Sequence, residues 1–187
     1  QDCYGDTVQK IRHIIGDTYR QHRYLLDALC FTEAEKHQFT KVMNCEMDDV
    51  TAQDALKNLS YYLHHYWRKR TILLLDEYDT PMQEAYVHGY WNEFINFIRG
   101  LFNSALKTNP YLERAVMTGI TRVSKESVFS DLNNLKVITI TSEEYADCFG
   151  FTEEEVFAAL KQTGLEDKKT DVKEWYDGFI FGSLHDI

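Results

Sequence analysis

Two adjacent acids that follow a short apolar run have the clearest chemical potential in this chain. Four apolar residues end the run Thr71–Leu75, and Asp76 and Glu77 come directly after it. A short apolar run that ends in acids is typical of a strand buried on both faces of a parallel sheet. The last side chains of such a strand lie at the carboxyl edge of the sheet, where ligands bind in open α/β folds. We therefore expect a ligand site at this edge.

The two acids have the chemistry needed to hydrolyse a nucleoside triphosphate. Asp76 could hold Mg²⁺ through the water shell of the ion, and Glu77, which points the other way along the pleat, could accept a proton from an attacking water. An apolar strand followed by Asp-Glu is the Walker-B pattern of ATPases, whose chemistry needs mainly positioning and charge neutralisation. A strand end with solvated acids that cap the next element fits the same short pattern.

A metal-dependent nuclease is another interpretation of the same stretch. Asp76, Glu77 and Asp79 could form a carboxylate cluster, because paired carboxylates bind metal ions in nucleases. A PD-(D/E)XK site, however, needs a lysine soon after the second acid, and Thr80-Pro81 stands there instead. We rank this interpretation last and expect Asp79 to cap or brace the loop.

Alternating buried strands and helices must position these acids. The apolar spacing predicts helices over residues 7–29, 32–44, 51–67, 91–107, 152–164 and 171–176, and buried strands over residues 71–75, 114–119 and 136–141. Thr32 and Thr152 each begin a capping box, and Asp6 is the expected N-cap of the first helix. This order predicts an α/β layered fold with a mostly parallel sheet. We expect an α/β core over residues 1–145 and a helical segment over residues 146–187.

Composition narrows the class of protein. The 187 residues, of which 44% are hydrophobic, suit one globular domain. The formal net charge of −10 argues against the dominant basic face that duplex DNA requires, so no direct nucleic-acid surface is expected. No apolar run approaches the roughly 18–20 residues of a membrane span. The four cysteines are scattered and suit a reducing cytoplasm, so we expect a cytoplasmic location.

Two further patterns have bland explanations. The longest basic run, Arg68-Lys69-Arg70, fits a solvated helix end whose cations suit the helix dipole. His64 and His65 lie among Tyr61, Tyr62, Tyr66 and Trp67, which raises the alternatives of a metal site or base stacking. Two histidines on a helix bind a metal best at a spacing of four residues, and these two are adjacent. We therefore expect a half-exposed aromatic helix face.

Several blocks in the second part of the chain resemble the bacterial and archaeal AAA-ATPase-like family, whose members often carry a PD-(D/E)XK nuclease-like domain at their C-terminus. The similarity covers about residues 70–187, and both the order and the spacing of the blocks agree with the family. The blocks are Ile72–Pro81, Met117–Ser127, Ser130–Leu135, Phe149–Glu155 and Trp175–Gly182.

The resemblance implies a three-layer P-loop NTPase-like fold of the AAA type, with ATP and Mg²⁺ as cofactors. Asp76 would organise Mg²⁺, and Glu77 would activate the attacking water. Thr118 would be the polar sensor near the γ-phosphate, and Arg122 would contact phosphate charge. The structural alternatives are a β-branched strand residue for Thr118 and an ion pair with Glu126 for Arg122.

The chain departs from the family in one respect. It contains no Gly-x-x-x-x-Gly-Lys-[Ser/Thr] loop to hold the phosphates. In the family that loop lies upstream of residue 1, and the nuclease-like domain lies beyond residue 187. We expect an internal fragment without ATPase activity of its own, whose partners are nucleotide, these two missing segments and, in self-association, a second copy. The alternative is a non-hydrolysing, nucleotide-dependent switch or scaffold that positions the nuclease-like domain.

A structural consequence follows from the resemblance. The P-loop strand of the family sits between the strands that we expect at residues 114–119 and 136–141. Without it the sheet would contain a slot with unpaired backbone groups, which are costly when buried. We expect rearrangement, a partner chain or the P-loop strand itself to close this slot.

Overall fold

The computed structural model describes residues 3–120, 129, 132, 135–148, 150–176, 178 and 180–185. The chain divides into two compact units, Gln1–Asn134 and Leu135–Ile187. The boundary between them, after Asn134, lies earlier in the sequence than the predicted boundary after residue 145. The division into functional domains stays a prediction.

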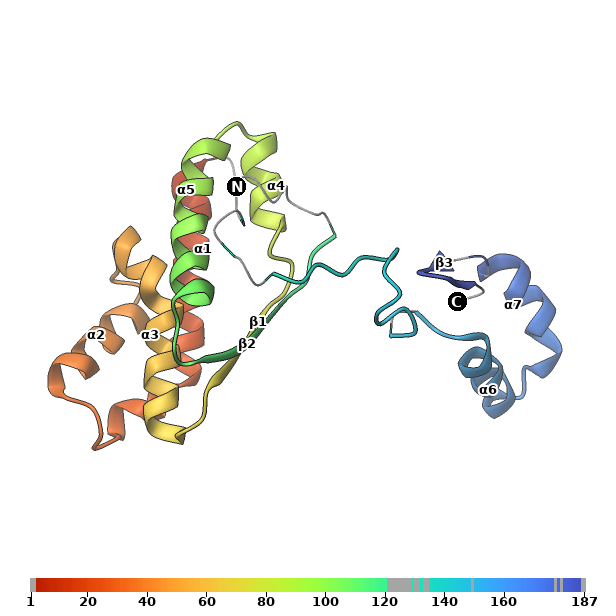
Figure 1. Cartoon of the computed structure of the whole chain (residues 1–187), viewed down its shortest axis with the longest axis horizontal. Coiled ribbons are helices and arrows are strands. Elements are labelled where there is room, and N and C mark those ends of the chain that lie inside the picture. The colour runs from red at the N-terminus through yellow and green to blue at the C-terminus, as the bar shows by residue number, and fades with distance from the viewer. Residues whose placement is uncertain are drawn as a thin grey trace. The chain divides into compact units, whose positions relative to one another are not determined.

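The first unit is a helical bundle that carries a small sheet (Figure 1). Its elements in chain order are α1 (Tyr4–Gln21), the 3₁₀ helix η1 (Arg23–Asp27), α2 (Glu33–Met43), α3 (Asp49–Trp67), β1 (Thr71–Leu75), α4 (Thr80–Val87), α5 (Trp91–Phe102), the π-helical turn η2 (Asn103–Lys107) and β2 (Leu112–Met117). The expected helices over 32–44, 51–67 and 91–107 and the expected strands over 71–75 and 114–119 are present, with ends that shift by a few residues.

Aromatic and aliphatic side chains from α1, α2 and α5 form the core. Tyr19, Phe39 and Phe94 are almost completely buried, and the rings of Tyr19 and Phe39 lie 4.6 Å apart. The Tyr19 hydroxyl donates a 2.7 Å hydrogen bond to the backbone oxygen of Ala55 in α3. Helices α1, α3 and α5 pack against one another, and α3 also contacts β1. The bundle therefore supports one face of the sheet.

The sheet of the first unit is a parallel pair. Leu73, Leu74 and Leu75 of β1 stand opposite Ala115, Val116 and Met117 of β2. The sequence predicts burial on both faces, and this prediction is wrong within this chain. Side chains alternate between half-buried and exposed, and Ile72 and Leu74 are 62% and 72% exposed. The reason is that the described helices cover only one face of the pair.

The first helix is shorter than the sequence predicts. The expected helix over residues 7–29 begins at Tyr4, after an N-cap at Cys3 rather than Asp6, and ends at Gln21. A 3₁₀ helix then leads to an extended backbone at Ala28. The tighter turn buries Leu25 and leaves Leu29 fully exposed, although the two residues would share one face of a continuous helix.

The strand expected over residues 136–141 is absent. These residues have an irregular backbone that ends in a turn, in which the Ser142 amide donates to the Thr139 carbonyl oxygen at 2.9 Å. The Ser142 hydroxyl accepts a 3.0 Å hydrogen bond from the Thr139 amide. Local bonds from serine and threonine compete with a strand ladder, and among the described residues no strand pairs with this β-branched segment.

The second unit is built around two short helices. It contains α6 (Glu153–Thr163), η3 (Glu166–Lys168), α7 (Lys169–Tyr176) and the antiparallel pair β3 (Ile180–Phe181) and β4 (Leu184–His185). The capping box at Thr152 is formed, and the expected helices over 152–164 and 171–176 are present. None of the residues of α6 and α7 is buried. This unit therefore has little core of its own.

Candidate functional site

The acids and the expected sensor threonine meet at the carboxyl edge of the parallel pair. Leu75 and Met117 end the two paired strands in register. Asp76 and Thr118 are therefore the residues that directly follow the two strand ends. The Thr118 amide donates to the Leu75 carbonyl oxygen at 2.9 Å, which extends the pairing by one residue. The Thr118 hydroxyl donates to the Asp76 carboxylate. Both side chains are exposed to solvent, as a ligand site at a sheet edge requires.

Glu77 is held beside this pair by its backbone. Its amide donates to the Thr118 hydroxyl oxygen at 3.4 Å. Its φ angle of 51° lies in the left-handed region, which costs a residue other than glycine roughly 1–2 kcal/mol. Unfavourable backbone conformations are concentrated at functional sites, where the surrounding structure maintains them. Thr118 thus contacts both acids.

Asp79 is buried in the turn between β1 and α4. Its side chain is only 1% exposed, and one carboxylate oxygen accepts a 2.9 Å hydrogen bond from the Gln83 side chain in α4. Asp79 is the N-cap residue of α4 by position, but its side chain makes no capping bond there. The expectation that Asp79 braces the loop fits this geometry.

Gly119 is a residue of this site that the sequence analysis missed. A Cβ atom at Gly119 would lie 2.4 Å from an Asp79 carboxylate oxygen and 2.9 Å from the ring of Tyr78. The Tyr78 amide donates to the Thr118 carbonyl oxygen at 3.0 Å. The turn therefore contacts the residues after β2 twice, through this backbone bond and through the side chains that pack against Gly119. A glycine directly after the end of a strand was the available signal, because it often marks a close approach.

The structure brings together three of the four predicted site residues, Asp76, Glu77 and Thr118. Arg122 lies outside the described residues. A single carboxylate with a neighbouring hydroxyl fits Mg²⁺, which keeps most of its water ligands and needs few protein ligands. The sequence contains no Gly-x-x-x-x-Gly-Lys-[Ser/Thr] motif, which holds the phosphates in P-loop NTPases.

The three-carboxylate interpretation is wrong. Among the described residues, no three histidine, cysteine or acidic side chains gather closely enough to hold a metal ion. Asp76, Glu77 and Asp79 are all described, and the third of them is buried against Gly119. They do not form a nuclease-type cluster.

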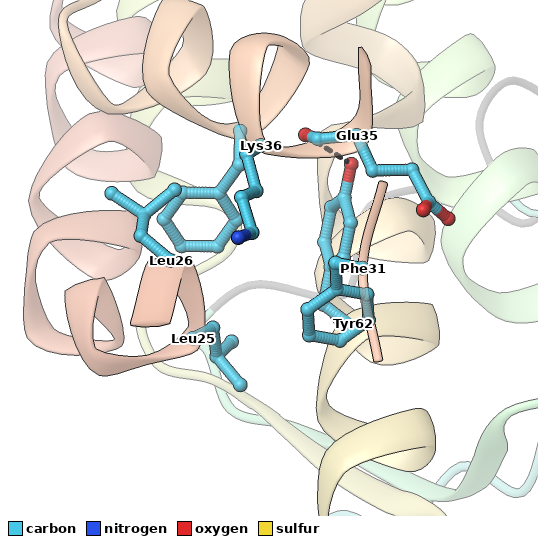
Figure 2. A pocket seen from close by; sticks show the side chains of 7 residues that line it. Leu25, Leu26, Phe31, Glu35, Lys36 and Tyr62 are labelled. Carbon is cyan, nitrogen blue, oxygen red and sulfur yellow. Dashed lines mark hydrogen bonds between the residues drawn. The ribbon is translucent and has the colours of Figure 1, made fainter. Parts of the chain in front are cut away.

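A second feature is a shallow apolar depression between η1, α2 and α3 (Figure 2). It has about 0 Å³ of volume that a water molecule could fill, far below the roughly 300 Å³ at which small-molecule pockets begin. Figure 2 shows the Tyr62 hydroxyl bonded to the Glu35 backbone oxygen, a distance of 3.2 Å. The Tyr61 hydroxyl donates to the Glu35 carboxylate at 2.6 Å. These contacts are structural and support no ligand site.

The aromatic surroundings of the two adjacent histidines are also structural. The His65 ring lies 4.0 Å from the Tyr61 ring, and both histidines contact Tyr111 at 5.4 to 5.8 Å. The expected half-exposed aromatic helix face is confirmed for this part of α3, whose residues Tyr61, His64 and His65 are neither fully buried nor exposed.

The fold and the site together describe a mixed α/β protein with polar side chains at the carboxyl edge of parallel strands. A sequence model of the family described as Predicted AAA-ATPase matches residues 10–129. The chain belongs to this AAA-ATPase-like family.

One curated relative is an uncharacterised protein from the 5′ region of vnfD in Azotobacter chroococcum mcd 1. It is 32% identical over 114 residues, which are 59% of this chain and 22% of that protein. The chain therefore spans about a fifth of the length of this relative. No solved structure matches the chain. Among the described residues, no helix has both the length and the apolar character needed to cross a membrane.

Proposed function

We propose that this chain contributes the magnesium-organising and water-activating strand of an ATP-hydrolysing domain in a longer protein. Asp76 orients waters of the Mg²⁺ ion, and Glu77 accepts the proton of the attacking water. Thr118 senses the γ-phosphate, with Arg122 as an additional phosphate contact. Membership of the AAA-ATPase-like family supports the class. The bond from the Thr118 hydroxyl to the Asp76 carboxylate, beside Glu77, is the observation that carries the proposal.

The three residues have distinct duties in this proposal. The Thr118 hydroxyl donates to Asp76 and accepts from the Glu77 amide, so a shift of β2 would move both acids together. The left-handed backbone of Glu77 turns the chain directly after the strand. Phosphoryl transfer depends mainly on such positioning and on charge neutralisation. A P-loop elsewhere in the longer protein would hold the triphosphate.

Replacement of Glu77 by glutamine in the full-length protein tests the assignment. Loss of a general base typically slows turnover by 10²–10⁴-fold, and nucleotide binding should persist because the backbone and Asp76 are unchanged. Glu46→Gln, at an exposed acid in the turn after α2, is the matched control and should leave turnover unchanged. Turnover that survives Glu77→Gln would eliminate the proposal. A wild-type protein that binds ATP without hydrolysing it would favour the nucleotide-dependent switch instead.

A further inference from the structure

An exposed group of aromatic and basic side chains lies where η1 meets the end of α3. We call this group the aromatic–basic patch and define it by its six residues, Arg23, Tyr24, Tyr66, Trp67, Arg68 and Lys69. The two segments are more than forty residues apart in the sequence. The ring centres of Tyr24 and Tyr66 are 5.4 Å apart, and the Trp67 indole N–H donates to the Tyr24 hydroxyl at 3.1 Å. The fold therefore assembles the patch.

The rings of the patch are unusually accessible. Trp67 is 58% exposed and Tyr66 is 41% exposed. Trp67 contacts Tyr24 and Tyr66 in edge-to-face geometry, with ring planes at 69° and 77°. The indole N–H lies in the ring plane, so its bond to Tyr24 uses an edge of the indole. Tryptophan is usually among the most buried residues on average, and a side chain this open has ring surface available for stacking.

Basic residues flank these rings in the sequence. Arg23, Arg68 and Lys69 are exposed, and within the described part of the chain none of them forms an ion pair. Arg70 is partly neutralised by Glu113 at 3.8 Å. Burial lowers the pKa of the neighbouring His22, which favours its neutral form. Asp27 is the acid on the same 3₁₀ helix. The patch therefore has a local positive charge despite the net charge of −10 for the whole chain.

We propose that the aromatic–basic patch binds single-stranded nucleic acid. Every base has a face that can stack on an aromatic ring, and nearby cations attract the phosphates. A duplex hides its base faces and needs a broader basic surface than this patch offers. An acidic peptide would use the cations but not the open rings. The proposal departs from two sequence-based expectations, that Arg68-Lys69-Arg70 is only a solvated helix end and that the chain has no direct nucleic-acid surface.

The patch is separate from the candidate nucleotide site. It ends at Lys69, one residue before β1 begins at Thr71, whereas Asp76 follows the carboxyl end of that strand. Five strand residues at about 3.3 Å each span roughly 16 Å, so one strand separates the two sites. A single strand bound at the patch would contact residues that the ATPase chemistry does not use, and nucleic-acid binding can be measured without ATP turnover.

Fluorescence anisotropy with a labelled 15-nucleotide oligo-dT, titrated with the 187-residue chain at low salt, tests the proposal. We expect binding that is at least about fivefold tighter than binding of an abasic strand of equal length and charge, because stacking provides a factor of about 5–150 per base. Trp67→Ala should weaken oligo-dT binding by at least about fivefold, while Trp67→Phe should retain most of it. Trp175→Ala, at a tryptophan that is 82% exposed in the second unit, is the matched control and should bind like wild type.

A salt titration tests the charges independently. Removing Arg68 and Lys69 together should reduce the slope of log K against log salt by about 1.4, since each phosphate contact on a single strand contributes about 0.7. If Trp67→Ala lowers the helical circular dichroism, Trp67→Phe and this slope decide the question. Four outcomes would each overturn the proposal. The first three are equal binding of oligo-dT and the abasic strand, equal effects of Trp67→Ala and Trp175→Ala, and no binding at low salt. The fourth is displacement of labelled oligo-dT by polyglutamate as readily as by unlabelled oligo-dT.

Discussion

Replacing Gly119 by alanine tests how tightly the candidate site is joined to its supporting turn. The new methyl group would lie 2.4 Å from an Asp79 carboxylate oxygen, 2.8 Å from the carboxylate carbon and 2.9 Å from the Tyr78 ring. All three distances are below the 3.0 Å at which neighbouring atoms must move. Gly119 directly follows Thr118, so any movement disturbs the contact between Thr118 and Asp76.

The energetic cost follows from what must move. The Asp79 side chain is almost fully buried and is held by Gln83, and the Tyr78 ring packs edge-on against Phe129 at 5.5 Å. Overpacking costs about 1–3 kcal/mol, and loss of a hydrogen bond to a charged group costs about 1.5–3 kcal/mol. Because one movement relieves the overlap and breaks the bond, we expect about 2–3 kcal/mol in total. For a chain of this size that lowers Tm by roughly 4–12 °C.

Urea and thermal unfolding of the 187-residue chain, followed by circular dichroism, provide the measurement. Gly5→Ala is the matched control, because a Cβ there meets only a sulfur at 3.9 Å and alanine is the better helix former in α1. We expect this control to be neutral or stabilised by up to about 1 kcal/mol. The Asp79→Ala/Gly119→Ala double variant should lose less stability than the sum of the single variants. A Gly119→Ala chain as stable as wild type would refute the close contact between the turn and the end of β2.

Three further predictions concern backbone strain, capping and pH. Glu77→Gly should raise the free energy of unfolding by up to about 1 kcal/mol, because glycine tolerates the left-handed backbone, and should abolish ATP turnover in the full-length protein. Thr32→Ala should cost α2 about 1 kcal/mol in urea unfolding, because the hydroxyl of the capping box is lost. The Tyr61 hydroxyl, helped by the amide and hydroxyl of Thr32, lowers the pKa of Glu35 below its ordinary 4.5. The ionised Glu35 therefore stabilises the fold above pH 4.5, and this stabilisation is lost as the pH falls through the lowered pKa. Tyr61→Phe should weaken the loss of the urea midpoint over this pH range.

Local sequence chemistry predicted the helices because it acts over three or four residues. Thr32 with Glu35, and Thr152 with Glu155, form the capping boxes that their spacing predicts. Tertiary packing decided the rest. Leu29 fits the helical pattern of the first helix, yet the chain leaves that helix at residue 21 and exposes Leu29 completely. Hydrophobic periodicity shows which residues could share a helix face. It does not show where packing against the rest of the fold ends the helix.

The candidate site was predictable to the extent that parallel strands share an edge. Asp76 follows one predicted strand and Thr118 lies near the end of the next, so their proximity follows from the pairing alone. The packing of Asp79 against Gly119 depends on how a turn and a strand end that are forty residues apart are positioned relative to each other. No local sequence pattern encodes that position. The left-handed backbone of Glu77 was hidden for a similar reason, since glutamate has no preference for that conformation.

The open face of the parallel pair connects the fold to the proposed function. Ile72, Leu74 and Val116 are 62%, 72% and 46% exposed on one face, although apolar residues on parallel strands are normally covered on both sides. The sequence of a strand encodes the need for a cover, but it does not encode which segment supplies it. The three-layer arrangement is therefore a proposal about the longer protein. In hydroxyl-radical footprinting, we expect Ile72 and Leu74 to be labelled readily in the 187-residue chain and protected in a longer protein that contains it. Equal labelling in both would contradict a covering layer and, with it, the P-loop type of fold.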